Sequence, residues 1–200
     1  VFDGGEGADS VLEGVTLTGG NATNGGGIHI SSSDPTLLDL RVEANSASNG
    51  GGLYLDDSSS SVSNIVVSDN TASTHGGGVF VLDSPSAGLR NSMFAGNSGQ
   101  YGGGMSVYNS SPTMANLVFA RNSGHAGGGI YFDCGAGGSL HNASIVGNES
   151  TGGDNDASGI QFDCLASPPD PELKNLSISG NTGGQGGIVV NAGTQDFQFC

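Results

Sequence analysis

The sequence has no tryptophan, and it has only four lysine or arginine residues against nineteen aspartate or glutamate residues, a formal net charge of −15. Nucleic acids, anionic membranes and acidic polysaccharides are bound through cationic side chains, which this chain can hardly supply. The sequence therefore argues against these three classes of partner.

Long hydrophobic runs are also missing. No stretch of about 18 apolar residues occurs, so we expect no helix that inserts into a membrane. The chain opens with VFDGGEGADS, which has neither a methionine nor a basic region. We therefore expect a mature or excised segment, with residues 1–200 forming a single domain or part of a longer one. Three cysteines do not by themselves settle the compartment.

What the sequence does contain is an internal repeat rich in glycine. The triplet GGG, or its remnant, ends at residues 27, 52, 78, 104, 129, 159 and 187. An alternation of apolar residues follows each one, as in GIHI, GLYL, GVFV and GIYF. Alternation of this kind predicts a strand with one buried face.

A second segment precedes each triplet and is equally regular, as in LLDLRV, VSNIVV and LHNASI. Each repeat of about 25 residues thus has two clear strands and a glycine-rich third side, and no repeat can bury its own apolar face. Stacking the repeats buries a continuous apolar column. The sequence predicts an all-β fold, a right-handed parallel β-helix of about seven coils.

Asparagine recurs three residues after the second apolar segment, and stacked coils would place these residues above one another. Each carboxamide can then donate to the next coil, which predicts a structural ladder. Asn21 fills this slot in the first repeat, although one residue later. A second column is predicted at Asn64, Asn91, Asn116, Asn142 and Asn175. The first ladder consists of Asn45, Asn70, Asn97, Asn122, Asn148 and Asn181.

The segments FAGN (94–97) and FARN (119–122), each followed by GGG and an apolar residue, resemble the repeats of chlamydial polymorphic outer-membrane proteins. The wider set is the pectate-lyase-like β-helix repeat proteins that bacteria secrete. The resemblance covers nearly the whole chain and implies the β-helix fold together with surface display or adhesion. It names no ligand.

GIYFDC and GIQFDC occupy the same register in consecutive repeats. Stacking would bring the Cα atoms of Cys134 and Cys164 within about 5 Å of one another, inside the range for a disulfide. The alternative is two free thiols. Asp133 and Asp163 would be stacked as well, a like-charge contact that a cation, solvent or Asn191 would relieve. Cys200 has no stacked partner in this scheme.

Calcium is the only cofactor that the sequence indicates, and plain acidic loops are the alternative. GGEGADSVL (4–12) matches the nonapeptide of calcium-binding rolls and contains Asp9, but it occurs once, without the tandem copies that share each ion. The insertion GGDNDAS (152–158) presents Asp154 and Asp156 in an oxygen-rich loop that would suit Ca²⁺. Asp133 and Asp163 complete the candidate ligands.

One outward column of the predicted strands could bind a ligand. The second residue after the triplet is aromatic at Tyr54, Phe80 and Tyr131, and such rings can stack on sugars or pack against a protein. Aromatic residues also simply favour strands, so a purely structural role is the alternative.

No catalytic residues emerge from the sequence. A uronate lyase needs clustered basic residues to stabilise its intermediate, and Arg41 stands alone in its column. We therefore expect a non-enzymatic, extracellular or cell-surface solenoid that is structural or adhesin-like. Its partners would be further copies stacked end to end, other surface proteins or glycans. The alternative is a carbohydrate-active enzyme or a glycan-binding module on the same scaffold.

Overall fold

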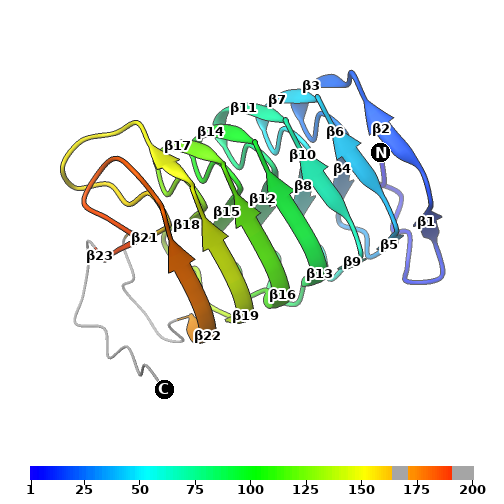
Figure 1. Ribbon diagram of the computed structural model, residues 1–200. Helices are drawn as coiled ribbons and strands as arrows, with labels where there is room; N and C mark the ends of the chain where they lie inside the picture. Colours follow the sequence, from blue (N-terminus) through cyan, green and yellow to red (C-terminus); the bar gives the residue numbers. More distant parts are fainter. Residues whose placement is uncertain (164–170, 191–200) are drawn as a thin grey trace.

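The computed structural model describes residues 1–163 and 171–190, and these form a rod of stacked coils with the N-terminus at one end (Figure 1). The predicted fold is confirmed: the chain is an all-β, right-handed parallel β-helix of about seven coils. The described residues contain no helix long and apolar enough to cross a membrane. Three parallel sheets, here called A, B and C, run along the rod.

Sheet A contains the strands that follow the glycine triplets. They are β4 (Ile28–Ser31), β8 (Leu53–Asp56), β12 (Val79–Leu82), β15 (Met105–Tyr108), β18 (Ile130–Phe132), β21 (Ile160–Phe162) and β23 (Ile188–Val190).

Sheet B contains the second apolar segment of each repeat, bent in the middle. In the first three coils the bend separates two short strands, and in the later coils one strand of eight residues runs through it. The strands are β1 (Val11–Glu13), β2 (Thr16–Thr18), β5 (Thr36–Leu38), β6 (Arg41–Glu43), β9 (Ser61–Ser63), β10 (Val66–Ser68), β13 (Gly88–Ala95), β16 (Thr113–Ala120), β19 (Ser139–Val146) and β22 (Glu172–Ser179).

The bend of sheet B explains the second asparagine column. Asn64, Asn91, Asn116, Asn142 and Asn175 all have positive φ, between 50° and 57°. Asparagine tolerates this left-handed backbone better than most residues because its short side chain bonds locally. The predicted contacts between coils form in part: Asn116 donates to Asn91, Asn142 to Asn116 and Asn175 to Asn142, at 2.9, 3.3 and 3.0 Å.

The third side, expected to be only glycine-rich turns, is a sheet of its own. Sheet C consists of β3 (Asn21–Asn24), β7 (Ser46–Asn49), β11 (Thr71–His75), β14 (Ser98–Tyr101), β17 (Ser123–Ala126) and β20 (Glu149–Ser150). Its strands lack the large apolar residues that reveal a strand in a sequence. The reason is steric, because a Cβ added to Gly99 of β14 would lie 2.8 Å from the backbone nitrogen of Gly77.

The core lies between sheets A and B and consists of apolar columns with one residue from each coil. Like stacks on like, because parallel strands pair equivalent residues of successive coils. The rings of Phe94 and Phe119 lie 4.8 Å apart, and those of Phe132 and Phe162 lie 4.9 Å apart. All four rings are buried.

The first asparagine ladder forms as predicted, from Asn45 to Asn181. Each Oδ1 accepts both the backbone N–H and the Nδ2 of the asparagine one coil earlier; for Asn97 donating to Asn122, both distances are 3.0 Å. The Nδ2 of Asn122 also donates to the carbonyl of Phe94 at 2.9 Å. Residues 45, 70, 97, 122 and 148 of this ladder are buried.

The assignment of Asn21 to this ladder was wrong. Asn21 pairs with Ser46 in sheet C and is exposed, whereas the backbone N–H of Gly20 donates to Oδ1 of Asn45 at 2.8 Å. Strand pairing fixes the register, so the residue before Asn21 occupies the slot beneath Asn45 and brings no side chain to it.

A buried serine ladder was missed. Ser33, Ser58, Ser84 and Ser110 stack at the turn after sheet A, and the backbone N–H of Ser58 donates to Ser84 Oγ at 3.0 Å. Ser84 donates likewise to Ser110 at 2.8 Å. The spacing of 25, 26 and 26 residues could have revealed the ladder, but serine is so frequent in the turns that the signal is weak.

We expect Asn122→Ala to lower the free energy of unfolding by about 3 kcal/mol, because it removes the shared acceptor of two buried N–H groups of Asn97 and the side-chain donor to the Phe94 carbonyl. Asn116→Gly, which removes an exposed amide at a left-handed position, should cost about 1 kcal/mol or less. Urea unfolding measures both, and equal losses would contradict a dominant role for the buried ladder.

The glycine triplet at residues 76–78, between β11 of sheet C and β12 of sheet A, allows a second comparison of stabilities. A Cβ at Gly77 would lie 2.4 Å from the carbonyl oxygens of both Ser98 and Gly103, so Gly77→Ala should cost about 3 kcal/mol or prevent folding. Gly88→Ala meets no atom within 4 Å and should be nearly neutral. Thermal unfolding followed by circular dichroism tests this, and similar midpoints for the two variants would show that the corner can relax.

Candidate functional site

The corner between sheets A and C holds a continuous row of aromatic rings, each in contact with the next through stacked, tilted or edge-on geometry. Successive ring centroids lie 5.0 to 5.7 Å apart. Sheet A supplies the outward column, and sheet C supplies a residue at the end of β11 and one at the end of β14. In order, the rings belong to His29, Tyr54, Phe80, His75, Tyr101 and Tyr131.

The predicted open surface of aromatic rings is therefore wrong. Tyr54, Phe80 and Tyr131 are only 5%, 6% and 5% exposed. Rings at the ends of two sheet C strands contact this column: His75 stacks between Phe80 and Tyr101, and Tyr101 also contacts Tyr131. A sugar or a protein cannot stack on rings that the chain itself covers. The signal was present in the sequence, since His75 and Tyr101 each stand directly before a glycine triplet.

Two phenols of this corner, those of Tyr54 and Tyr131, are held in the neutral form. Burial and the charge of Asp56 raise the pKa of Tyr54 to about 12. Burial, the charge of Asp133 and a hydrogen bond to Asp163 raise the pKa of Tyr131 still further. Burial likewise lowers the pKa of His75 and disfavours its cation. These groups suit packing better than proton transfer at neutral pH.

The candidate calcium ligands that the structure describes do not come together at one site. Asp9 and Asp154 are exposed loop residues. Asp156 accepts from the backbone N–H of Gly153 at 2.8 Å. Within residues 1–163 and 171–190, no group of three His, Cys, Asp or Glu side chains is arranged to hold a metal ion. Calcium binding stays a prediction.

Asp133 and Asp163 are in register, as expected, but their surroundings differ from the expectation. Tyr131 donates to Asp163 Oδ2 at 2.9 Å, and Gln161 donates to Oδ1 at 3.0 Å. Asp133 accepts from the backbone N–H of Cys134 at 2.7 Å. The chain's own donors thus bond to both carboxylates. Asn191, which we expected to relieve their repulsion, lies outside the described residues.

Cys134 is disulfide-bonded. Its predicted partner Cys164 lies outside the described residues, as does Cys200. The pairing of Cys134 with Cys164 therefore stays a prediction.

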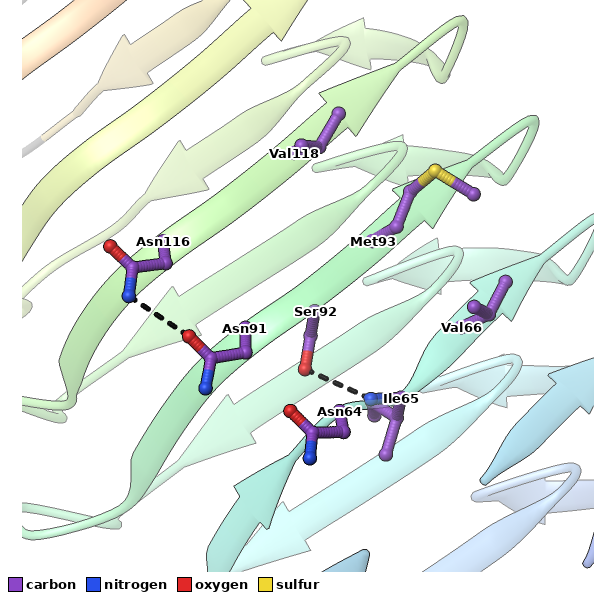
Figure 2. Close-up of a pocket in the computed structure, with 8 residues that line it drawn as sticks. All are labelled: Asn64, Ile65, Val66, Asn91, Ser92, Met93, Asn116 and Val118. Atoms are coloured by element: carbon purple, nitrogen blue, oxygen red, sulfur yellow. Dashed lines mark hydrogen bonds between the residues drawn. The ribbon is translucent and has the colours of Figure 1, made fainter. Parts of the chain in front are cut away.

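A shallow groove runs along the bend on the outer face of sheet B (Figure 2). Its lining comes from three successive coils and contains no charged side chain. One wall is a row of exposed asparagine amides. The other wall is a row of apolar side chains, with one residue from each coil. We call this feature the sheet B groove; it is lined by Asn64, Ile65, Val66, Asn91, Ser92, Met93, Asn116 and Val118.

Sequence reasoning missed the sheet B groove because it searched for aromatic and charged residues. Met93 is 37% exposed, the kind of exposure that marks a large apolar side chain without cover. Val66 pairs with Met93, and Met93 pairs with Val118, so the three residues form one row along the rod. The available signal was an apolar residue two positions after Asn64, Asn91 and Asn116, on the outward side of the strand.

The raised pKa of Tyr131 predicts that the protein loses stability at alkaline pH. Because the pKa of Tyr131 is raised by folding, its contribution to stability is complete below the ordinary tyrosine pKa of about 10 and is lost as the pH rises above it. Tyr131→Phe should therefore flatten the fall in melting temperature between about pH 9 and 12, whereas Tyr108→Phe, at an exposed position, should leave it steep. Parallel curves for all three proteins would count against this assignment.

Comparison with known proteins places the fold in a family. The model of the right-handed β-helix region matches residues 4–164, well over half of the chain. No curated protein and no solved structure gives a significant match. The matched region contains the aromatic residues at the corner of sheets A and C, the sheet B groove, and both asparagine columns except Asn175 and Asn181. The chain belongs to the right-handed β-helix family.

Proposed function

We propose that this chain is a non-enzymatic, extracellular rod that displays a binding surface, in the manner of an adhesin or of a subunit in a surface assembly. The observation that carries the proposal is the unbroken buried asparagine ladder, in which each coil is bonded to the next by side chains as well as backbone. A stack of this kind resists bending and local opening, because a coil cannot separate without leaving buried amides unpaired.

The hydrogen bonds of three carboxylates support the same proposal. The carboxylate of Asp163 accepts from Tyr131 and Gln161, and that of Glu6 accepts from the backbone of Gly4 and from Ser33. The Asp83 carboxylate accepts from Asn109 at 2.5 Å. These polar groups hold the coils and the N-terminal segment together, which is a structural use.

The likeness to chlamydial surface repeats supports a location outside the cell. FAGN and FARN have a physical explanation here, since Phe94 and Phe119 stack in the core while Asn97 and Asn122 form ladder rungs. Further copies stacked end to end stay part of the proposal as partners of the rod.

The competing function is a carbohydrate-active enzyme, and one pair of assays separates the two. Purified chain incubated with neutral and uronate polysaccharides should produce no new reducing ends and no unsaturated uronates. Beads coated with the chain should be retained on a mucin-coated surface more than beads coated with serum albumin. Product formation that Asp56→Asn or Asp163→Asn abolishes would overturn the non-enzymatic proposal. Equal retention of the two kinds of bead would overturn the adhesive one.

A further inference from the structure

The sheet B groove differs from the rest of the surface in charge. Strands β13 and β16, which supply most of its lining, contain no aspartate or glutamate, although the chain carries nineteen acidic residues. The neighbouring strand β19 has none either. A neutral partner can therefore lie here without desolvating a carboxylate, whereas the net charge of −15 repels a polyanion at long range.

The amides of the groove have unused hydrogen-bonding capacity. A carboxamide offers two N–H donors and two acceptor lone pairs. In the exposed ladder, Asn116 spends one donor on Asn91 at 2.9 Å and accepts one bond from Asn142 at 3.3 Å. Asn116 thus keeps one donor and one acceptor position directed to solvent. Asn91 accepts from Asn116 and is itself exposed, as is Asn64 one coil earlier, so the groove offers polar groups at the spacing of the coils.

The opposite wall supplies apolar contact. Val66, Met93 and Val118 form a row parallel to the amides, and Figure 2 shows the two rows side by side along the rod. A ligand that fits both walls needs an apolar face beside polar edges, repeated at regular intervals. A pyranose ring has this character, because its C–H groups form the face and its hydroxyl groups the edge.

The spacing of the coils distinguishes a glycan from a peptide. Successive coils lie about 4.8 Å apart, the distance between neighbouring strands. An extended peptide advances only about 3.3–3.6 Å per residue, so a peptide along the groove loses register within a few coils. One pyranose ring of an extended, linear chain advances close to one coil spacing and keeps its register.

We propose that the sheet B groove binds a linear neutral polysaccharide, with one sugar ring over each of the coils that carry Asn64, Asn91 and Asn116. The proposal rests on the proposed display function, for which it names the ligand class. Each ring packs its face on the apolar row, and its hydroxyl groups donate to and accept from the amides. Affinity rises with chain length up to the number of coils that line the groove.

Calorimetric titration of the full chain tests the proposal. The probes are cello-, xylo- and manno-oligosaccharides of two, three and six sugars, with oligogalacturonate for comparison because Arg90 lies beside Asn91 on β13. At least one neutral series should bind, with affinity increasing from two to three sugars and little further at six. No binding by any neutral series, or tighter binding of the uronate, overturns the proposal.

Asn91→Gly and Asn175→Gly form a matched pair of variants. Both residues are exposed asparagines of the same column with similar φ, 50° and 54°, and glycine adopts this backbone without strain. Only Asn91 lines the groove. Asn91→Gly should weaken oligosaccharide binding about tenfold, the loss of one or two hydrogen bonds, and Asn175→Gly should leave it unchanged. Equal affinities for the two variants overturn the groove assignment.

The two proposals fail in different ways. If wild-type beads are retained on mucin but the chain binds none of the neutral oligosaccharides, adhesion resides elsewhere on the rod, and the groove proposal fails while the display function stands. If the wild-type chain cleaves its oligosaccharide, the display function fails although the groove binds. Circular dichroism and the urea midpoint of each variant show that the fold is intact before binding is compared.

Discussion

Backbone hydrogen bonding between successive coils is the constraint on which the rest of this molecule depends. Each strand pairs in parallel with its equivalent one repeat later, as Val79 does with Met105 and Val81 with Val107. This pairing fixes the coil spacing at about 4.8 Å and places equivalent residues directly above one another. The core and the surface of the rod are therefore both built from columns, each with one equivalent residue from every coil.

Stacking like on like has different consequences for different side chains. Phenylalanine rings stack well, as Phe132 does with Phe162. A carboxamide both donates and accepts, so a column of asparagines satisfies itself even when buried. A carboxylate only accepts, so the acidic positions need donors from elsewhere. Asp163 takes them from Tyr131 and Gln161, which explains why such polar residues gather at the end of sheet A.

The aromatic residues at the corner of sheets A and C and the sheet B groove differ in solvent exposure, and exposure decides which of them can contact a ligand. Both are outward columns on a sheet, and the sequence marks the aromatic one more strongly. Tyr101 of sheet C contacts Tyr131 on sheet A, and Tyr131 is 5% exposed, whereas Met93 on sheet B is 37% exposed. The aromatic column, which the sequence marks most clearly, is thus part of the internal packing. The row of Val66, Met93 and Val118 is the more accessible surface.

The sequence by itself determined the fold, the number of coils and the asparagine ladder. These follow from the repeat length, the apolar alternation and the recurrence of single residues, all of which are local or periodic. Sheet C, the slot below Asn45 and the burial of Tyr54 were decided only by the tertiary structure. They depend on how the third side of each coil packs against the other two. The small residues of this side carry no apolar pattern. The backbone of one coil also approaches the glycine triplet of its neighbour closely, and such a contact between coils cannot be read from one repeat alone.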